Sequence, residues 1–221
     1  MQNVFSICTR FPGKREKPMN KQNSTIMKLA ETALLAALCY VSFTFLQIKI
    51  PVPGGDATSL HIGNTFCVLG ALLLGGWYGG LAGSIGMTIA DLMDPVYITG
   101  APKTFVLKLC IGLITGLVAH KIAKINETND KKYVFKWSLI ASIAGLAFNV
   151  IADPIVGYFY KQYILGQPQE VAGILAKLSA GATFVNAIVS TILVVIIYNA
   201  VRPALIKANL IHVYVTAANA K

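Results

Sequence analysis

Ionisable side chains interrupt the long apolar runs of this 221-residue sequence at a few positions. Asp91, Lys108, Asp153 and Lys177 lie inside such runs or at their edges. An ionisable group in the hydrocarbon core of a bilayer costs roughly 2.5–3.5 kcal/mol even on lenient insertion scales, so such groups are rare and usually functional. Carboxylates and ammonium groups in this setting could bind a polar ligand, relay protons or tie two helix ends together.

The apolar runs that carry these groups predict membrane-spanning helices. The sequence is 55% hydrophobic and 13% charged, whereas soluble chains carry about 25% charged residues. Runs of about 18 or more apolar residues match a hydrocarbon core of roughly 30 Å. We therefore predict an all-α membrane protein of about six transmembrane helices, at residues 28–48, 61–76, 78–93, 104–123, 137–160 and 174–200.

Prolines and glycines mark the ends and contacts of these helices. Pro51 and Pro53 should end the first helix, because a proline ring cannot continue it, and residues 50–60 are expected to form a loop. Pro154 is expected to kink the fifth helix. The short GGWYGG turn allows only a tight hairpin of the second and third helices. Its glycines at 75, 76, 79, 80 and 83 form overlapping GxxxG spacings, which let helix backbones approach closely.

Basic residues predict the orientation. With both termini in the cytoplasm, fourteen Lys and Arg residues fall on the cytoplasmic side and only Lys49, Lys103 and Lys161 on the outer side. The net charge of +10 therefore indicates membrane topology rather than nucleic-acid binding. We expect a cytoplasmic tail at 1–26, a six-helix membrane domain at 27–205 and a second cytoplasmic tail at 206–221. Residues 14–17 are what a purine-rich ribosome-binding site would encode if it were translated, so Met19 is a hypothetical start. The alternative is that the tail is part of the protein.

Polar groups gather in the outer halves of the predicted helices. This one-sided placement predicts a ligand pocket open to the outside and roofed by the loops at 50–60, 94–103 and 161–173. Structural roles stay open: Asp91 or Asp94 could pair with Lys103 or Lys108. Asn149 and Asn186 could make interhelical hydrogen bonds worth about 0.6 kcal/mol. The candidate substrate-binding residues are His61, Asn64, Asp91, Lys103, Lys108, Asn149, Asp153, Tyr158, Lys177 and Asn186.

Tyrosines near the same face have two interpretations. Tyr97, Tyr158, Tyr160 and Tyr163 could belong to the interfacial aromatic belt or stack on a flat ring. We interpret Tyr160 and Tyr163 as belt residues.

Signatures of catalysis are absent from the sequence. It contains no GxxxxGK[ST], HExxH or GxSxG motif, and its four cysteines and three histidines have no metal-site spacing. We therefore predict no enzymatic activity, no cofactor and no metal. The two halves show no matching broken helices of the kind that many secondary transporters have.

Several segments in order resemble a known family over about residues 27–205. They are LAETALLAAL, HIGNTFCVLGALLLGGWYGGLAG, TIADLMDP, APKTFVLKLCIGLITGL and NAIVSTILVVIIY. Together they resemble the substrate-binding subunits (S components) of energy-coupling factor (ECF) vitamin transporters, a type of ABC importer. The resemblance implies the S-component fold of six helices and capture of a water-soluble vitamin at the outer face of a bacterial cell membrane.

The resemblance also implies partners. These are a transmembrane coupling subunit and two ATPase subunits of an energising module, with the lipid bilayer around them and no nucleic acid. An AxxxA motif on the first helix would make the docking surface; Ala33 and Ala37 have this spacing, and internal packing is the alternative.

The substrate class is narrowed by the resemblance and by charge. The sequence looks closest to S components for pyridoxine, hydroxymethylpyrimidine or riboflavin. A pocket with carboxylates and lysines suits a small polar heteroaromatic ring with hydroxyls better than a polyanion, which would favour arginines. The alternative function is an autonomous secondary transporter of a small polar metabolite, in which Asp91 or Asp153 relays protons.

Overall fold

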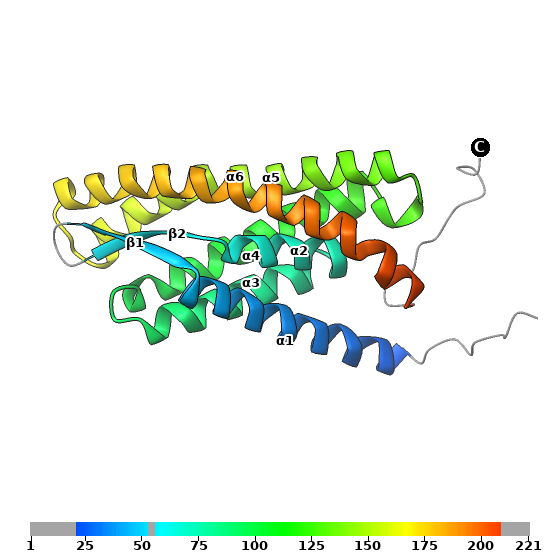
Figure 1. The fold of residues 1–221 in the computed structure, drawn as a ribbon. Helices are drawn as coiled ribbons and strands as arrows, with labels where there is room; N and C mark the ends of the chain where they lie inside the picture. Colours follow the sequence, from blue (N-terminus) through cyan, green and yellow to red (C-terminus); the bar gives the residue numbers. More distant parts are fainter. Residues whose placement is uncertain (1–20, 53–55, 209–221) are drawn as a thin grey trace, which may run out of the picture.

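Six α-helices make up nearly all of the structure, a computed structural model that describes residues 21–52 and 56–208. The helices lie roughly along one common direction (Figure 1). They are α1 (Lys21–Phe45), α2 (Gly63–Leu74), α3 (Gly76–Met93), α4 (Ala101–Gly116), α5 (Lys131–Phe159) and α6 (Gln169–Lys207). The predicted all-α fold of about six helices is confirmed.

Four helical segments of the described chain are long and apolar enough to cross a membrane: Thr25–Phe45, Ile98–Glu127, Lys131–Ile164 and Gln169–Lys207. The second and third helices, α2 and α3, are not among them. α2 has 12 residues, so it is about 18 Å long, shorter than a hydrocarbon core of roughly 30 Å. Cys67, Val68 and Leu72 on it are fully buried. The predicted boundaries of 61–76 are therefore wrong, and α2 is a buried inner helix.

A β-hairpin replaces the loop that the sequence predicted at 50–60. Strands β1 (Gln47–Val52) and β2 (Asp56–His61) pair antiparallel, with Gln47 opposite His61 and Val52 opposite Asp56. The β-branched residues Ile48, Ile50 and Val52 alternate along β1, which favours a strand. The hairpin shortens both neighbours: α1 ends at Phe45, and His61 ends β2 instead of beginning a helix.

Short irregular helices join the long ones. The 3₁₀ turn η1 (Ile98–Gly100) leads into α4, the π-helical turns η2 (Leu117–Ile122) and η4 (Tyr160–Ile164) extend α4 and α5, and η3 (Ile125–Glu127) precedes α5. The buried Arg202 of α6 holds the η3 region, because its guanidinium donates to the carbonyl oxygens of Ile125 (2.9 Å) and Thr128 (3.1 Å). α5 continues through Pro154, and the kink expected at this proline stays a prediction.

Glycines allow α2, α3 and α4 to pack with their backbones in contact. A Cβ atom on Gly79 would lie 2.0 Å from the backbone nitrogen of Ala71 in α2. On the next face of α3, a Cβ on Gly112 of α4 would lie 2.2 Å from the Cα of Gly80. The predicted close approach of these helices is confirmed, and it leaves one compact group of three helices.

The described ends of the chain lie together. α1 begins and α6 ends at one end of the molecule, with the α4–α5 connection beside them, while the hairpin and the α5–α6 connection lie at the opposite end (Figure 1). From the distribution of basic residues we expect the first end in the cytoplasm and the hairpin outside, and the hairpin end is called the outer end in this sense. α1 already begins at Lys21, within the predicted tail; residues 1–20, with the Met19 hypothesis, and 209–221 lie outside the described residues.

Candidate functional site: a polar cavity at the outer end

A cavity of about 130 Å³ lies at the outer end of the helices. Strand β2 contributes Ala57, Thr58, Ser59 and His61 to its wall, and α4, α5 and α6 contribute most of the remainder. It also reaches Asn64 in the first turn of α2 and Asp91 in the last turn of α3. The predicted pocket on the outer side therefore has a counterpart in the structure.

Three helices line the cavity in steps of three or four residues. α4 and α6 run inward from the outer side, whereas α5 runs outward, so position along each helix gives depth. Residues near the start of α4 and α6 and near the end of α5 therefore lie at the rim of the cavity. Residues later in α4 and α6, or earlier in α5, lie deeper. The lining residues are 100, 103, 104, 107 and 108 on α4 and its preceding turn, 149, 153, 154 and 157 on α5, and 175, 176, 179, 183 and 186 on α6.

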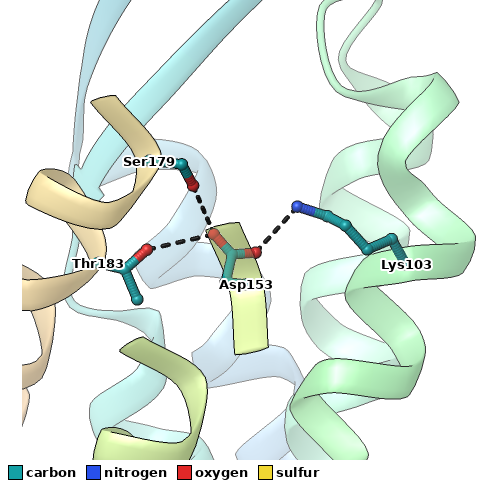
Figure 2. Close-up of polar contacts among 4 residues, drawn as sticks. All are labelled: Lys103, Asp153, Ser179 and Thr183. Carbon is teal, nitrogen blue, oxygen red and sulfur yellow. Dashed lines mark hydrogen bonds and ion pairs between the residues drawn. The ribbon is translucent and has the colours of Figure 1, made fainter. Parts of the chain in front are cut away.

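The middle of the cavity contains a carboxylate that joins three helices. Asp153 of α5 accepts from the Lys103 ammonium of α4 at 2.9 Å, and its other oxygen accepts from the hydroxyls of Ser179 and Thr183 on α6 (Figure 2). The side chains of the ion pair are 16% and 15% exposed. We call these four residues the Asp153 clamp. Because three donors occupy its carboxylate, Asp153 fixes the relative positions of α4, α5 and α6.

The inner end of the cavity presents polar groups with unsatisfied hydrogen-bonding capacity. Asn64 is 1% exposed, Asn149 2% and Lys108 8%. Within the described part of the chain, the Oδ1 atoms of Asn64 and Asn149 have no hydrogen-bond partner, and Lys108 makes no ion pair within 4.0 Å. Nearby, the carboxylate of Asp91 has a hydrogen bond with Thr104. Buried polar atoms in proteins are nearly always paired, so these groups indicate a place for a ligand or ordered water.

The hairpin is fastened over the cavity on two sides. The amide of Asn186 on α6 accepts from the backbone N–H of His61 at 3.0 Å and donates to the carbonyl of Ser59 at 2.9 Å. On the other side Lys49 of β1 pairs with Asp94 and lies over the Tyr97 ring, 5.4 Å from its centroid. Asn186 thus has a structural role that sequence alone did not distinguish from ligand binding.

His61 is held as a neutral ring at the edge of an aromatic wall. Its Nδ1 accepts from the backbone N–H of Gly63 at 3.2 Å, so the neutral ring carries its proton on Nε2. Burial lowers the pKa of His61 to about 3, and the positive charge of Lys108 acts in the same direction. The ring packs edge-on against Phe43 at 4.7 Å, and Phe43 contacts Tyr97 at 5.9 Å. Phe43, His61 and Tyr97, the aromatic wall, all line the cavity.

Most predicted site residues meet at this cavity. Its lining includes eight of the ten: His61, Asn64, Asp91, Lys103, Lys108, Asn149, Asp153 and Asn186. Tyr158 and Lys177 are not among the lining residues. Tyr158 packs edge-on against Phe159 at 5.4 Å, and Lys177 is exposed on α6. Each is one position beyond a lining residue, which turns its side chain by about 100° around the helix axis.

Sequence reasoning missed several cavity residues. Ser179 and Thr183 follow Leu175 at intervals of four residues, so a search for polar residues in phase with one helix face would have found them. Tyr160 also lines the cavity. Its hydroxyl donates to the carbonyl of Thr99 at 2.9 Å, and this hydrogen bond connects two sides of the cavity rim. The belt interpretation of Tyr160 did not anticipate this place in the cavity wall, and it stays a prediction. Tyr163 is 72% exposed and stacks on Phe159, in agreement with a belt position.

A metal site has no support in the described residues, which contain no group of three or more His, Cys, Asp or Glu side chains able to hold an ion. In the same part of the chain Cys39, Cys67 and Cys110 are free thiols.

Comparison with known sequences decides the family. The profile of the family described as "ECF-type riboflavin transporter, S component" matches residues 23–203. The chain belongs to this family. The resemblance predicted from sequence is thereby confirmed, and this S component is a multi-pass membrane protein and a binding subunit of a vitamin transporter. No curated protein sequence matches the chain.

A solved structure shares the fold of this S component. ThiT from Listeria monocytogenes superposes with a TM-score of 0.61 at 20% sequence identity, over 83% of this chain and 98% of that one. At this identity the likeness concerns the fold alone.

Proposed function

We propose that this S component captures riboflavin at the outer face of a bacterial plasma membrane and delivers it inward when docked on an ATP-driven energising module. The observation that supports the proposal most directly is the polar cavity at the outer end of an otherwise apolar bundle. The family description names riboflavin transporters, which favours riboflavin over the pyridoxine and hydroxymethylpyrimidine classes.

The lining of the cavity suits a flat ring with a hydroxylated chain. The aromatic wall offers ring faces and edges for contact with a planar heterocycle. The Asp153 clamp and the hydroxyls of Thr58, Thr99 and Thr104 supply donors and acceptors for hydroxyl groups. Among the described residues the cavity contains lysines but no arginine, the side chain that makes planar bidentate contacts with phosphates. Free riboflavin therefore fits the lining better than its phosphorylated forms.

Binding is tested with purified protein. The S component is produced in cells grown in rich medium, purified in detergent, and any co-purifying small molecule is identified by mass spectrometry. The ligand-free protein is then titrated with riboflavin, whose fluorescence reports binding, and with pyridoxine and hydroxymethylpyrimidine as controls. Stoichiometric riboflavin and saturable quenching are expected. Binding of one of the control vitamins with no response to riboflavin would refute the substrate assignment.

Docking on the energising module is the second half of the proposal. Ala33 and Ala37 are both exposed on the outward face of α1, so neither is used for internal packing. Small side chains on an exposed helix face permit close contact with another helix in a membrane. This supports α1 as the surface that meets the coupling subunit.

One uptake experiment distinguishes this proposal from the alternative, an autonomous secondary transporter. Asp153, a candidate proton relay, is engaged by three donors, which favours a structural role for this residue. Riboflavin uptake is measured in cells that express the S component with and without the coupling and ATPase subunits. Uptake should require the module; equal uptake in its absence would support the autonomous transporter.

A further inference from the structure

The inner end of the cavity combines three groups from three helices. Asn64 comes from α2, Lys108 from α4 and Asn149 from α5, and all three are more than nine-tenths buried. The thiol of Cys67, one turn along α2 from Asn64, contacts the carbonyl of Lys108 at 3.5 Å, so α2 and α4 are tightly packed at this level. These helices have close backbone contacts through glycines. The three groups are therefore held on a rigid surface.

Their hydrogen-bonding pattern specifies what they can bind. Each carboxamide has one acceptor and an amino group that donates, and an ammonium only donates. In the described structure the acceptors of Asn64 and Asn149 are unpartnered, so they need a donor. The Lys108 ammonium has no carboxylate in contact, so it needs an electron-rich acceptor. An N–H flanked by two carbonyls meets all three groups when one carboxamide accepts from the N–H, the other, turned by 180°, donates its amino group to one carbonyl, and Lys108 donates to the second carbonyl.

We infer that the inner end of the cavity recognises a dione edge, a –CO–NH–CO– group in a planar heterocycle, through Asn64, Lys108 and Asn149. This inference rests on the proposed function, since riboflavin has such an edge in its pyrimidinedione ring. The ring then enters first and the hydroxyl chain lies toward the Asp153 clamp and the rim. The reverse orientation fits less well, because a chain hydroxyl is a weaker acceptor for a buried ammonium than a dione carbonyl.

Ligand analogues test this orientation without changing the protein. 3-Methylriboflavin keeps the ring system and the chain but has a methyl group in place of the N–H hydrogen of the dione edge. A site that hydrogen-bonds a buried N–H rejects such an analogue strongly, because its own acceptors are left unpaired. The affinity of the wild-type protein for 3-methylriboflavin should be at least about 100-fold lower than for riboflavin.

Variants then test which residues recognise the edge. Asn149→Ala should weaken riboflavin binding by about 10-fold or more while changing 3-methylriboflavin binding by less than about threefold, since that contact is already lost. Asn64→Ala and Lys108→Met are tested in the same way. Asn199→Ala is the control: Asn199 lies on α6, binds the Val195 carbonyl and does not line the cavity. It should keep the full discrimination, and thermal unfolding of each variant checks that it is folded.

The outcomes separate this inference from the proposed function. Equal affinity of the wild-type protein for riboflavin and 3-methylriboflavin would overturn the inference and leave riboflavin binding intact. Unchanged discrimination in all three folded variants would overturn the assignment of these residues. Failure of the wild-type protein to bind either flavin would refute the proposed function itself, and the inference with it.

Discussion

The Asp153 clamp makes the sharpest prediction about stability. Asp153→Asn keeps the shape of the side chain but removes the charge that Lys103 contacts at 2.9 Å. Removing one partner of a fully buried ion pair costs about 3–5 kcal/mol, because the other charge is left buried and unpaired. The side chains of Lys103 and Asp153 are 16% and 15% exposed and face a cavity that admits water. We therefore expect a smaller loss, about 2 kcal/mol of unfolding free energy.

This loss is measurable as a shift of the melting temperature of the ligand-free protein in detergent. For a chain of this size about 1 kcal/mol corresponds to a shift of roughly 2–4 °C, so Asp153→Asn should lower Tm by about 4–8 °C. In the double variant with Lys103→Met no lysine charge is left at the clamp. Its destabilisation should be smaller than the sum of the two single effects by about 1–2 kcal/mol.

A second ion pair on the same molecule provides the matched control. Lys49 and Asp94 are also paired, but their side chains are 43% and 18% exposed. Exposed pairs contribute about 0–1 kcal/mol, so Lys49→Met and Asp94→Asn should each shift Tm by only a few degrees. Additive effects of Lys103→Met and Asp153→Asn, or equal effects at the two pairs, would refute the reasoning that the clamp ties α4, α5 and α6 together.

Three further predictions concern docking, packing and pH. Ala33→Trp should spare riboflavin binding and abolish uptake. The control Ala147→Trp, at an exposed alanine of α5, should spare both binding and uptake. Loss of riboflavin binding in a folded Ala33→Trp protein would contradict the docking role. Gly79→Ala should lower Tm strongly, because the new Cβ would lie 2.0 Å from the backbone of Ala71. The control Gly181→Ala, at a position with open space around it, should be neutral or stabilise the protein by up to about 1 kcal/mol. Since the pKa of His61 is about 3 in the folded protein and 6.5 ordinarily, the unfolded state binds the extra proton, and stability should fall as pH drops below about 6.5. Tm measured at pH 7.5 and pH 5 should therefore fall less in His61→Gln than in the wild type, and equal falls would exclude a buried neutral ring.

The sequence by itself determined the class of protein and the end of the helix bundle at which its polar residues gather. Both depend on patterns that extend over many residues: apolar runs long enough to span a bilayer, and lysines concentrated in particular connections. The same holds for the glycine contacts of α3, because GxxxG spacing places small residues on one helix face. Eight cavity residues could be named for this reason, since burial of an ionisable or amide group in an apolar run is costly wherever the group points.

The tertiary structure alone decided what each of those residues contacts. The spacing of charges allowed Asp153 to bind a ligand or relay a proton, and only the meeting of α4, α5 and α6 shows it engaged by Lys103, Ser179 and Thr183. Lys177 was wrongly assigned to the cavity because the direction of a side chain around the helix axis turns by about 100° per residue. Which residues face the cavity therefore depends on where the helix begins and how it packs. The hairpin escaped prediction because two short strands gain stability only from pairing with each other and from the asparagine of a helix more than 120 residues away along the chain.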